Sequence, residues 1–447
     1  MMSMPLCRWR LHLNAVTIRP RSLRMPNPAQ ATIDPIVVGN DAFSRLASYC
    51  VERYPDLPIT LIADTRTVSA AGNEVARVLT RAGRTVRSII LRGDNLHADE
   101  LGLARVLTAS PYGPSLFVAV GSGTITDITR YVSFRLGQPF VSVPTASSVD
   151  GFASIGSPLV IEGVKRTHAG QTPRAIFADS TVIAAAPAIL TASGFGDLLG
   201  KITSIADWRL GRLIRDEPFD EAIAARATAA VDRCVAQVDA IGRREPQAVE
   251  TLFHALTDTG LCMIEFGESR PASGAEHHIS HFWEMAMLRL GMATALHGMQ
   301  VGIATAIVAG FYQQLRGLTA ANVSRLLADR IPLGEHPQEA EIRAAYGPLA
   351  DTIIRDHAEY LEFSANEQTM IAERVVERWD EVLEIAHTVP GPEEVKSLLT
   401  KAGAPVDPAL LNLPPDQLAA GIRRAHYLRT RFTSAKLCHM LGLLETV

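Results

Sequence analysis

The sequence has no strong excess of charge of either sign and no long uninterrupted hydrophobic run. Its 43 Lys and Arg residues against 47 Asp and Glu residues give a formal net charge of −4, whereas a nucleic-acid-binding protein needs a positive surface. The most apolar stretch, residues 296–312, contains His297, Gln300 and three glycines, and a membrane-spanning helix needs about 20 predominantly apolar residues. We therefore expect no nucleic-acid partner and no membrane span, and interpret residues 296–312 as a buried core helix.

Cysteine is also scarce. The five cysteines are Cys7, Cys50, Cys234, Cys262 and Cys438. Because they lie far apart and no two have CxxC spacing, a zinc knuckle, a redox dithiol and a disulfide framework are excluded. An odd number of scattered thiols indicates a reducing compartment, and we expect a cytoplasmic protein.

The first 30 residues contain five arginines and lack acidic residues, since the first acid is Asp34. That composition is typical of a transit peptide. A disordered tail, or a start codon assigned too early with Met25 as the true start, explains it as well. We favour this second interpretation and predict a disordered tail over residues 1–30.

The rest of the chain has the composition of a folded protein. It is 47% hydrophobic and 20% charged over 447 residues in total, which excludes a disordered chain. At about 150 residues per domain, this length favours two or three domains.

Short apolar runs alternate with amphipathic stretches from Ile36 onward. Strands are expected at residues 59–64, 86–91, 116–120 and 140–143, and helices at residues 69–82, 101–109 and 125–136. Continuous apolar strands that alternate with helices are typical of a parallel sheet covered on both faces.

The pattern changes after about Pro187. Long helical patterns follow, such as residues 221–241 and 248–266, and strand signals largely vanish. We therefore predict an α/β domain over residues 31–186 and an all-α domain over residues 187–447. A cleft between two such domains is a usual place for a ligand.

Two loops follow neighbouring predicted strands. Gly121-Ser122-Gly123-Thr124 ends one strand and opens a helix, where free backbone N–H groups and the helix dipole favour a phosphate. The loop does not have the GxGxxG spacing, and a tight strand-to-helix turn explains it about equally well. Residues 144–151 follow the next strand and are rich in hydroxyls. Ligands of open α/β sheets bind at this edge, so the two loops together favour a ligand site over two polar turns.

Histidines cluster in the second half of the chain. Four of the 13 histidines are His277, His278, His281 and His297. His277 and His281 are four residues apart and share one face of a helix. Asp197 lies in a small, apolar segment, where it caps a helix or pairs with a cation. A carboxylate and two imidazoles leave a coordination position open, and such a donor set suits Zn²⁺, Ni²⁺ or Fe²⁺.

Four sequence blocks resemble one known family. They are GSGTITDITRY, VPTASSVDGFAS, GFGDLLGK with the later Asp207-Trp208, and SGAEHHISHFWE with LHGMQVGIAT. In this order they resemble the sn-glycerol-1-phosphate dehydrogenases, most closely the bacterial type, within the iron-containing alcohol dehydrogenase and dehydroquinate synthase-like superfamily. The resemblance implies an N-terminal Rossmann-like parallel-sheet domain followed by an all-α metal-binding domain.

The resemblance also implies site residues, position by position. The pyrophosphate loop of the family falls on Gly121, Ser122, Gly123, Thr124 and Asp127. Further dinucleotide contacts fall on Thr145, Ser148 and Ser154, and an adenosine-ribose contact on Asp64. The metal ligands fall on Asp197, His277 and His297, and substrate contacts on Asp150, Asp197 and His281. Asp197 and His281 are thereby the expected catalytic residues.

The activity that the resemblance implies is hydride transfer between a nicotinamide cofactor and glycerol 1-phosphate, whose oxidised form is dihydroxyacetone phosphate. It implies one divalent metal, a small phosphorylated substrate and a homodimer. NAD and NADP both stay open, because Asp64 repels a 2′-phosphate while the nearby Arg66 accepts one. Lys201 is a candidate for the substrate phosphate, with a solvated helix residue as an equal alternative. Other interpretations are a dehydroquinate synthase-like cyclase, a glycerol dehydrogenase, or a non-catalytic metal-dependent binding protein.

Overall fold

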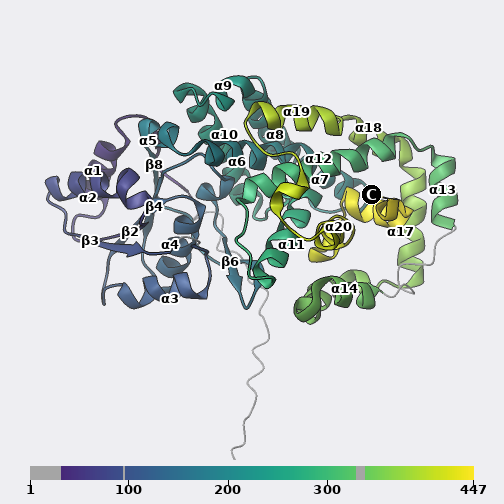
Figure 1. Ribbon diagram of the computed structural model, residues 1–447, viewed down its shortest axis with the longest axis horizontal. Coiled ribbons are helices and arrows are strands. Elements are labelled where there is room, and N and C mark those ends of the chain that lie inside the picture. The colour runs from purple at the N-terminus through teal and green to yellow at the C-terminus, as the bar shows by residue number, and fades with distance from the viewer. Residues whose placement is uncertain (1–31, 94–95, 329–337, 447) are drawn as a thin grey trace, which may run out of the picture.

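The computed structural model describes residues 32–93, 96–328 and 338–446. Figure 1 shows a sheet with its helices at one end of the molecule and the later helices at the other. The tail predicted for residues 1–30 lies outside the described residues.

A six-stranded parallel sheet has the strand order β1-β8-β5-β4-β2-β3. The strands are β1 (Ile36–Val38), β2 (Ile59–Asp64), β3 (Val86–Leu91), β4 (Leu116–Gly121), β5 (Phe140–Pro144) and β8 (Ile176–Ala178). The four predicted strands are confirmed as β2 to β5. The short strands β1 and β8 were not predicted, because a run of three residues carries little pattern.

Helices cover both faces of the sheet, as the strand pattern predicts. They are α1 (Ala42–Arg53), α2 (Asn73–Arg81), α3 (Glu100–Ala109) and α4 (Gly123–Arg135). Leu61 of β2 packs in a core with residues of α1 and α2, and its neighbour Ile62 packs in a second core with residues of α3 and α4. Successive side chains of a strand point to opposite faces, so a strand that is apolar throughout serves two cores. A π-helical turn, Val68–Gly72, precedes α2 within the helix predicted over residues 69–82.

An antiparallel hairpin that the sequence pattern did not predict follows β5. Its strands are β6 (Ser157–Ile161) and β7 (Val164–His168). Arg130 of α4 is fully buried and donates hydrogen bonds to the backbone carbonyls of Gly151, Phe152 and Gly156. This guanidinium therefore fixes the segment that leads into the hairpin.

The described chain after β8 is helical. The helices are α5 (Ser180–Ala185), α6 (Ala188–Leu199), α7 (Lys201–Arg215), α8 (Glu221–Val235), α9 (Val238–Gly242), α10 (Pro246–Phe266), α11 (Ala275–Arg289), α12 (His297–Arg316), α13 (Ala320–Ala328), α14 (Gln338–Tyr346), α15 (Ala350–Asp356), α16 (Ala358–Leu361), α17 (Ala365–Glu377), α18 (Trp379–His387), α19 (Pro392–Lys401), α20 (Pro415–Arg424) and α21 (Ser434–Leu441). The single helix predicted at residues 221–241 is wrong in one respect, since a turn divides it into α8 and α9. The segment holds neither Gly nor Pro before Gly242, so its pattern gave no sign of a break.

The helix α12 runs through the core of the helical region. It packs against α6, α11, α18 and α19, which confirms the buried core helix predicted at residues 296–312. Among the described residues, none of the helices has the length and apolarity that a membrane crossing requires. We propose to divide the chain into domains at residues 31–186 and 187–447. This division is supported by the position of β8, the last strand of the sheet, which ends at Ala178.

Candidate active site

The glycine loop lies at the carboxyl edge of the sheet, where β4 turns into α4. A Cβ atom at Gly121 would lie 2.6 Å from the Cβ of Ile125, so only glycine permits this close turn. Ser122 has an extended backbone and α4 begins at Gly123. The first N–H groups of the helix lack intrahelical partners and form a place for a phosphate group.

The other residues predicted to bind the dinucleotide lie at the same edge or next to it. Asp64 ends β2, which is paired with β4, and one of its oxygens accepts the N–H groups of Arg66 and Thr67. Thr145 and Ser148 are buried just after β5. The Ser154 hydroxyl accepts the Gly156 N–H.

Asp127 differs from the rest of the glycine loop. Its carboxylate forms an ion pair of 2.6 Å with the buried Arg130. Burial raises the pKa of Asp127 to about 7, although the Arg130 charge opposes the shift. The structure therefore gives Asp127 a partner in its own helix, and through Arg130 it is linked to the segment that leads into the β6–β7 hairpin.

Three side chains from three helices converge next to this edge. Asp197 lies in α6, His277 in α11, and His297 is the first residue of α12. One donor atom from each lies within 4.8 Å of the others, and the His277 Nε2 is 3.5 Å from the Asp197 Oδ1. The helices approach closely, because a Cβ at Gly196 would lie 2.3 Å from the Gly298 carbonyl oxygen. This backbone contact places the neighbouring Asp197 and His297 side by side.

Buried charges around Asp197 are matched. Lys201 is 0% exposed, and its Nζ lies 2.8 Å from both the Asp197 Oδ1 and the Asp150 Oδ2. The Asp150 N–H also donates to Asp197. Burial opposes ionisation of Asp197, but the Lys201 charge and a hydrogen bond from His277 lower its pKa well below the usual range. Both interpretations of Lys201 are therefore wrong: it is neither solvated nor free for a phosphate, and it acts as the counter-ion of two aspartates.

Glu276, the residue before His277 in α11, contacts His277 directly. Its carboxylate is fully buried and lies 2.7 Å from the His277 Nδ1. It also accepts the Gly274 N–H and the Thr203 hydroxyl. A carboxylate on one ring nitrogen fixes the orientation of the ring and makes the other nitrogen a better metal ligand.

A second buried carboxylate holds the start of α11. Asp207 accepts hydrogen bonds from the Ala275 N–H, the Ser434 N–H and the Tyr312 hydroxyl. Burial and the nearby Glu276 charge raise the pKa of Asp207 to about 7.

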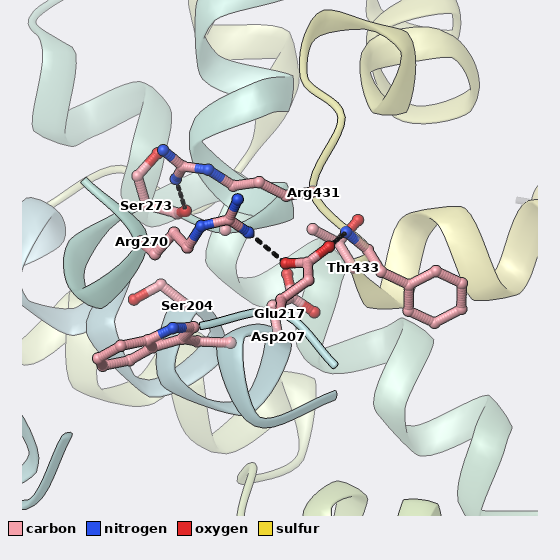
Figure 2. Close-up of a pocket in the computed structure, with 10 residues that line it drawn as sticks. Ser204, Asp207, Glu217, Arg270, Ser273, Arg431 and Thr433 are labelled. Atoms are coloured by element: carbon pink, nitrogen blue, oxygen red, sulfur yellow. Dashed lines mark hydrogen bonds and ion pairs between the residues drawn. The ribbon is translucent and has the colours of Figure 1, made fainter. Parts of the chain in front are cut away.

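A small pocket lies beside Asp207 and is shown in Figure 2. There Arg270 pairs with Glu217, and Arg431 donates to the Ser273 carbonyl. The pocket volume is about 10 Å³, too small for an organic substrate. It belongs to the support of α11 rather than to a substrate site.

His281 lies next to the three converging side chains. Its ring centroid is 5.6 Å from that of His297 and 6.1 Å from that of His277. Burial, followed by the charge of Lys165, holds the pKa values of His281 and His297 well below the usual range. Both rings are therefore neutral and offer a lone pair.

The donor set fits a divalent metal. It comprises a carboxylate oxygen and two imidazole nitrogens, and the buried His297 Nδ1 has no hydrogen-bond partner among the described residues. Burial and the Asp197 charge raise the pKa of Asp150, whereas the partners of Asp197 and Glu276 lower the pKa values of these two carboxyls. The carboxylates of Asp197 and Glu276 favour a cation beside them. The open glycine loop at the sheet edge likewise fits a dinucleotide pyrophosphate.

Sequence reasoning missed Glu276, Arg130 and the Lys165 side chain of β7. The sequence held one signal for Glu276 and Arg130, since each is a charged residue in a helical segment that is expected to be buried. A buried charge needs a partner. The sequence could not tell which partner, since the contacts of Arg130 and the bond from Thr203 to Glu276 join residues distant in the chain.

Comparison with known proteins gives consistent results. A family model described as iron-containing alcohol dehydrogenase matches residues 37–187. A Geobacillus thermodenitrificans protein named glycerol-1-phosphate dehydrogenase (NAD(P)+) is 34% identical over 93% of this chain and 94% of its own length. A Halalkalibacterium halodurans protein of the same name is 35% identical over 90% of this chain and 91% of its own.

Solved structures show the same fold. Glycerol dehydrogenase from Schizosaccharomyces pombe superposes with a TM-score of 0.57 at 18% identity, over 92% of this chain and 88% of that chain. A 1,3-propanediol oxidoreductase gives a TM-score of 0.60 at 14% identity, over 93% of this chain and 98% of that chain. The predicted architecture, a Rossmann-like parallel sheet followed by a helical region, is thereby confirmed.

Proposed function

The chain belongs to the glycerol-1-phosphate dehydrogenase family, and on this premise we propose that it interconverts dihydroxyacetone phosphate and sn-glycerol 1-phosphate with NAD or NADP as cofactor. The observation that carries the proposal is the convergence of Asp197, His277 and His297 beside the carboxyl edge of a sheet that carries a glycine loop. That arrangement brings a metal donor set close to a dinucleotide loop, as hydride transfer requires.

We propose that Asp197, His277 and His297 hold a divalent metal such as Zn²⁺, Ni²⁺ or Fe²⁺. When bound, the metal supplies an electrophile for the substrate oxygen, and the nicotinamide cofactor supplies or accepts the hydride. Lys201 and Asp150 hold the Asp197 carboxylate from one side. Glu276 holds the His277 ring from the other side.

His281 has the position and protonation state of a substrate contact. It is neutral, because burial lowers its pKa, so one ring nitrogen donates a hydrogen bond and the other accepts one. We propose that it binds a substrate hydroxyl and that Asp150 binds a second polar group, while the N–H groups from Gly123 onward bind the cofactor pyrophosphate. Thr145, Ser148, Ser154, Asp64 and Asp127 remain proposed cofactor residues.

The test is an assay of the metal-reconstituted protein with dihydroxyacetone phosphate and each reduced cofactor, with chiral analysis of the product. Net oxidation of NADH or NADPH and formation of sn-glycerol 1-phosphate are expected. A cyclase consumes no net NADH, a glycerol dehydrogenase prefers the unphosphorylated substrate, and a binding protein binds metal without turnover. Each of these three results contradicts the proposal in its own way.

Two further properties are part of the proposal. We propose a homodimer, which the resemblance to the bacterial members of the family supports and which light scattering of the purified protein tests. We also propose a cytoplasmic location. It is supported by the free, buried thiols of Cys50, Cys234, Cys262 and Cys438, and cell fractionation tests it.

A further inference from the structure

One face of α11 continues beyond the two histidines. His277, His281 and Glu284 are spaced four and then three residues apart, so they share this face. The Glu284 carboxylate accepts a hydrogen bond of 2.5 Å from the Nζ of Lys165, and both side chains are 12% exposed. Lys165 therefore joins the β6–β7 hairpin to the helix that carries His277 and His281.

A second cation lies near the same histidine. Arg429 follows a short 3-10 helix, Ala425–Leu428, that packs against α11. Its guanidinium donates to the carbonyl of Leu428, and among the described residues no carboxylate lies within ion-pair distance of it. Arg429 and Lys165 both lie within electrostatic range of His281, since the charge of each lowers the pKa of that ring.

The other candidate cation near the site is already neutralised. Lys201 is fully buried and forms ion pairs with two aspartates, so these carboxylates already balance its positive charge. The cluster beyond His281 holds Lys165, Arg166 and Arg429 against Glu284 and Asp356, where Arg166 pairs with Asp356. Three positive charges against two negative ones leave the cluster net positive, and the guanidinium of Arg429 presents a planar set of donors that matches phosphate.

We propose that Lys165 and Arg429 form the subsite for the phosphate dianion of the substrate, beside the face of α11 that carries His281 and Glu284. This assignment rests on the proposed function, because a triose phosphate places its phosphate a few bonds from the reacting carbon. Glu284 holds Lys165 in position before the ligand binds. The subsite selects the phosphorylated substrate over its free alcohol, because a dianion satisfies both cations and a hydroxyl does not.

The main experiment compares dihydroxyacetone phosphate with dihydroxyacetone as substrates of the metal-loaded full chain. In Lys165→Met and Arg429→Met, kcat/KM for the phosphorylated substrate is expected to fall about 30-fold or more, since each loses a charged hydrogen bond. For dihydroxyacetone the change stays within about threefold. Lys165→Arg and Arg429→Lys keep the charge and recover part of the loss. Lys396→Met removes an exposed lysine that pairs with Glu393 and serves as the control.

Inorganic phosphate gives a readout that is independent of turnover. Its affinity for the metal-loaded protein, measured by calorimetry, is expected to fall in both Met variants, while the Kd of NADH stays unchanged. An equal loss of activity on both substrates overturns the proposed subsite, because it indicates that the side chain only holds the β6–β7 hairpin against α11. Unchanged phosphate affinity, or an equal loss of NADH affinity, also overturns it. If the wild type does not reduce dihydroxyacetone phosphate, the proposed function fails, and the phosphate affinities still decide the subsite.

Discussion

Two clusters of buried ionisable side chains differ in how their charges are stabilised. The candidate metal cluster is made of Asp150, Asp197, Lys201, Glu276, His277 and His297. The carboxyl-terminal base cluster is made of His357, His426, Lys436 and His439. In the first cluster, opposite charges lie within 2.8 Å of one another. In the second cluster, Lys436 lies 3.2 Å from the His357 Nε2 and 3.6 Å from the Tyr360 ring centroid.

The protonation states differ accordingly. At the candidate metal cluster, Asp150 and Asp197 outweigh burial and raise the pKa of Lys201, so lysine and carboxylate both stay charged. At the base cluster, burial lowers the pKa of Lys436 well below its usual range and that of His357 to about 2, so His357 is neutral and burial disfavours the charged form of Lys436. Burial alone therefore does not decide the charge of a side chain. Its partners decide it, and only the cluster with matched charges is equipped to bind a cation.

The largest expected effect comes from removing a proposed metal ligand. His297→Ala leaves one carboxylate and one imidazole, so bound metal is lost and kcat/KM falls about 10³-fold, while NADH still binds. Metal analysis and steady-state kinetics measure this. His278→Gln changes a buried histidine in the same site region and retains the metal. Full metal content in His297→Ala would contradict the ligand assignment.

The second prediction breaks the charge balance of the candidate metal cluster. Lys201→Met leaves Asp150 and Asp197 buried without their counter-ion, and removal of one partner from a buried pair costs about 3 kcal/mol or more. Chemical denaturation of the metal-free protein measures the loss in the free energy of unfolding. A divalent metal is expected to restore part of the stability, because it supplies the missing positive charge. An unchanged unfolding curve would show that the two aspartates are not ionised.

A smaller effect is expected at the residue that positions His277. Glu276→Gln keeps the shape of the side chain but removes its charge, so metal affinity is expected to fall about 10- to 100-fold. Metal titration by calorimetry measures the affinity directly. Glu265→Gln removes an exposed carboxylate that pairs with Arg226 and is expected to leave metal affinity unchanged. If Glu276→Gln and Glu265→Gln bound the metal with equal affinity, the role of Glu276 would be only to cap the start of α11.

The smallest effect is expected at the base cluster. Because burial disfavours the charge of Lys436 and none of its described contacts is an ion pair, Lys436→Met is expected to keep the free energy of unfolding within about 1 kcal/mol of the wild type, in contrast to Lys201→Met.

The pH dependence sharpens this contrast. The pKa of Lys436 is lowered in the folded state from its usual 10.5, so the unfolded chain binds more protons between the lowered pKa and 10.5. Lys436 therefore adds stability as the pH rises through this window. Lys436→Met is expected to have a flatter stability profile than the wild type, measured by denaturation at several pH values. If Lys436→Met lost as much free energy of unfolding as Lys201→Met, Lys436 would be charged in the folded protein.

Much of the sheet could be predicted from the sequence. The strands β2, β4 and β5 are largely apolar runs of five or six residues, and β3 ends in three apolar residues. The short β1 and β8 left no such pattern. The β6–β7 hairpin was missed although Glu162 and Gly163, the two residues of its turn, both have positive φ, as a tight hairpin turn requires. The sequence did not show the contact of the buried Arg130 guanidinium with the chain before the hairpin. That contact lies outside any local pattern.

At the candidate site, the spacing of His277 and His281 and the setting of Asp197 indicated the donor types. The helical period did not indicate that Glu276 contacts His277, since adjacent residues of a helix point in different directions. Here both side chains bend toward each other because Glu276 is held by Gly274 and Thr203. Lys201 was misjudged for the same reason: its charge is visible in the sequence, but its partners are not.

The sequence by itself determined the alternation of strands and helices, the glycine turn after β4 and the kinds of side chain available for chemistry, because these follow from local periodicity and residue type. The tertiary structure alone decided which charges meet. Asp150 bonds to Asp197 across 47 positions of the chain, and Thr203 to Glu276 across 73. In a buried site the ionisation of each group depends on such distant neighbours, since water is not there to stabilise the charge.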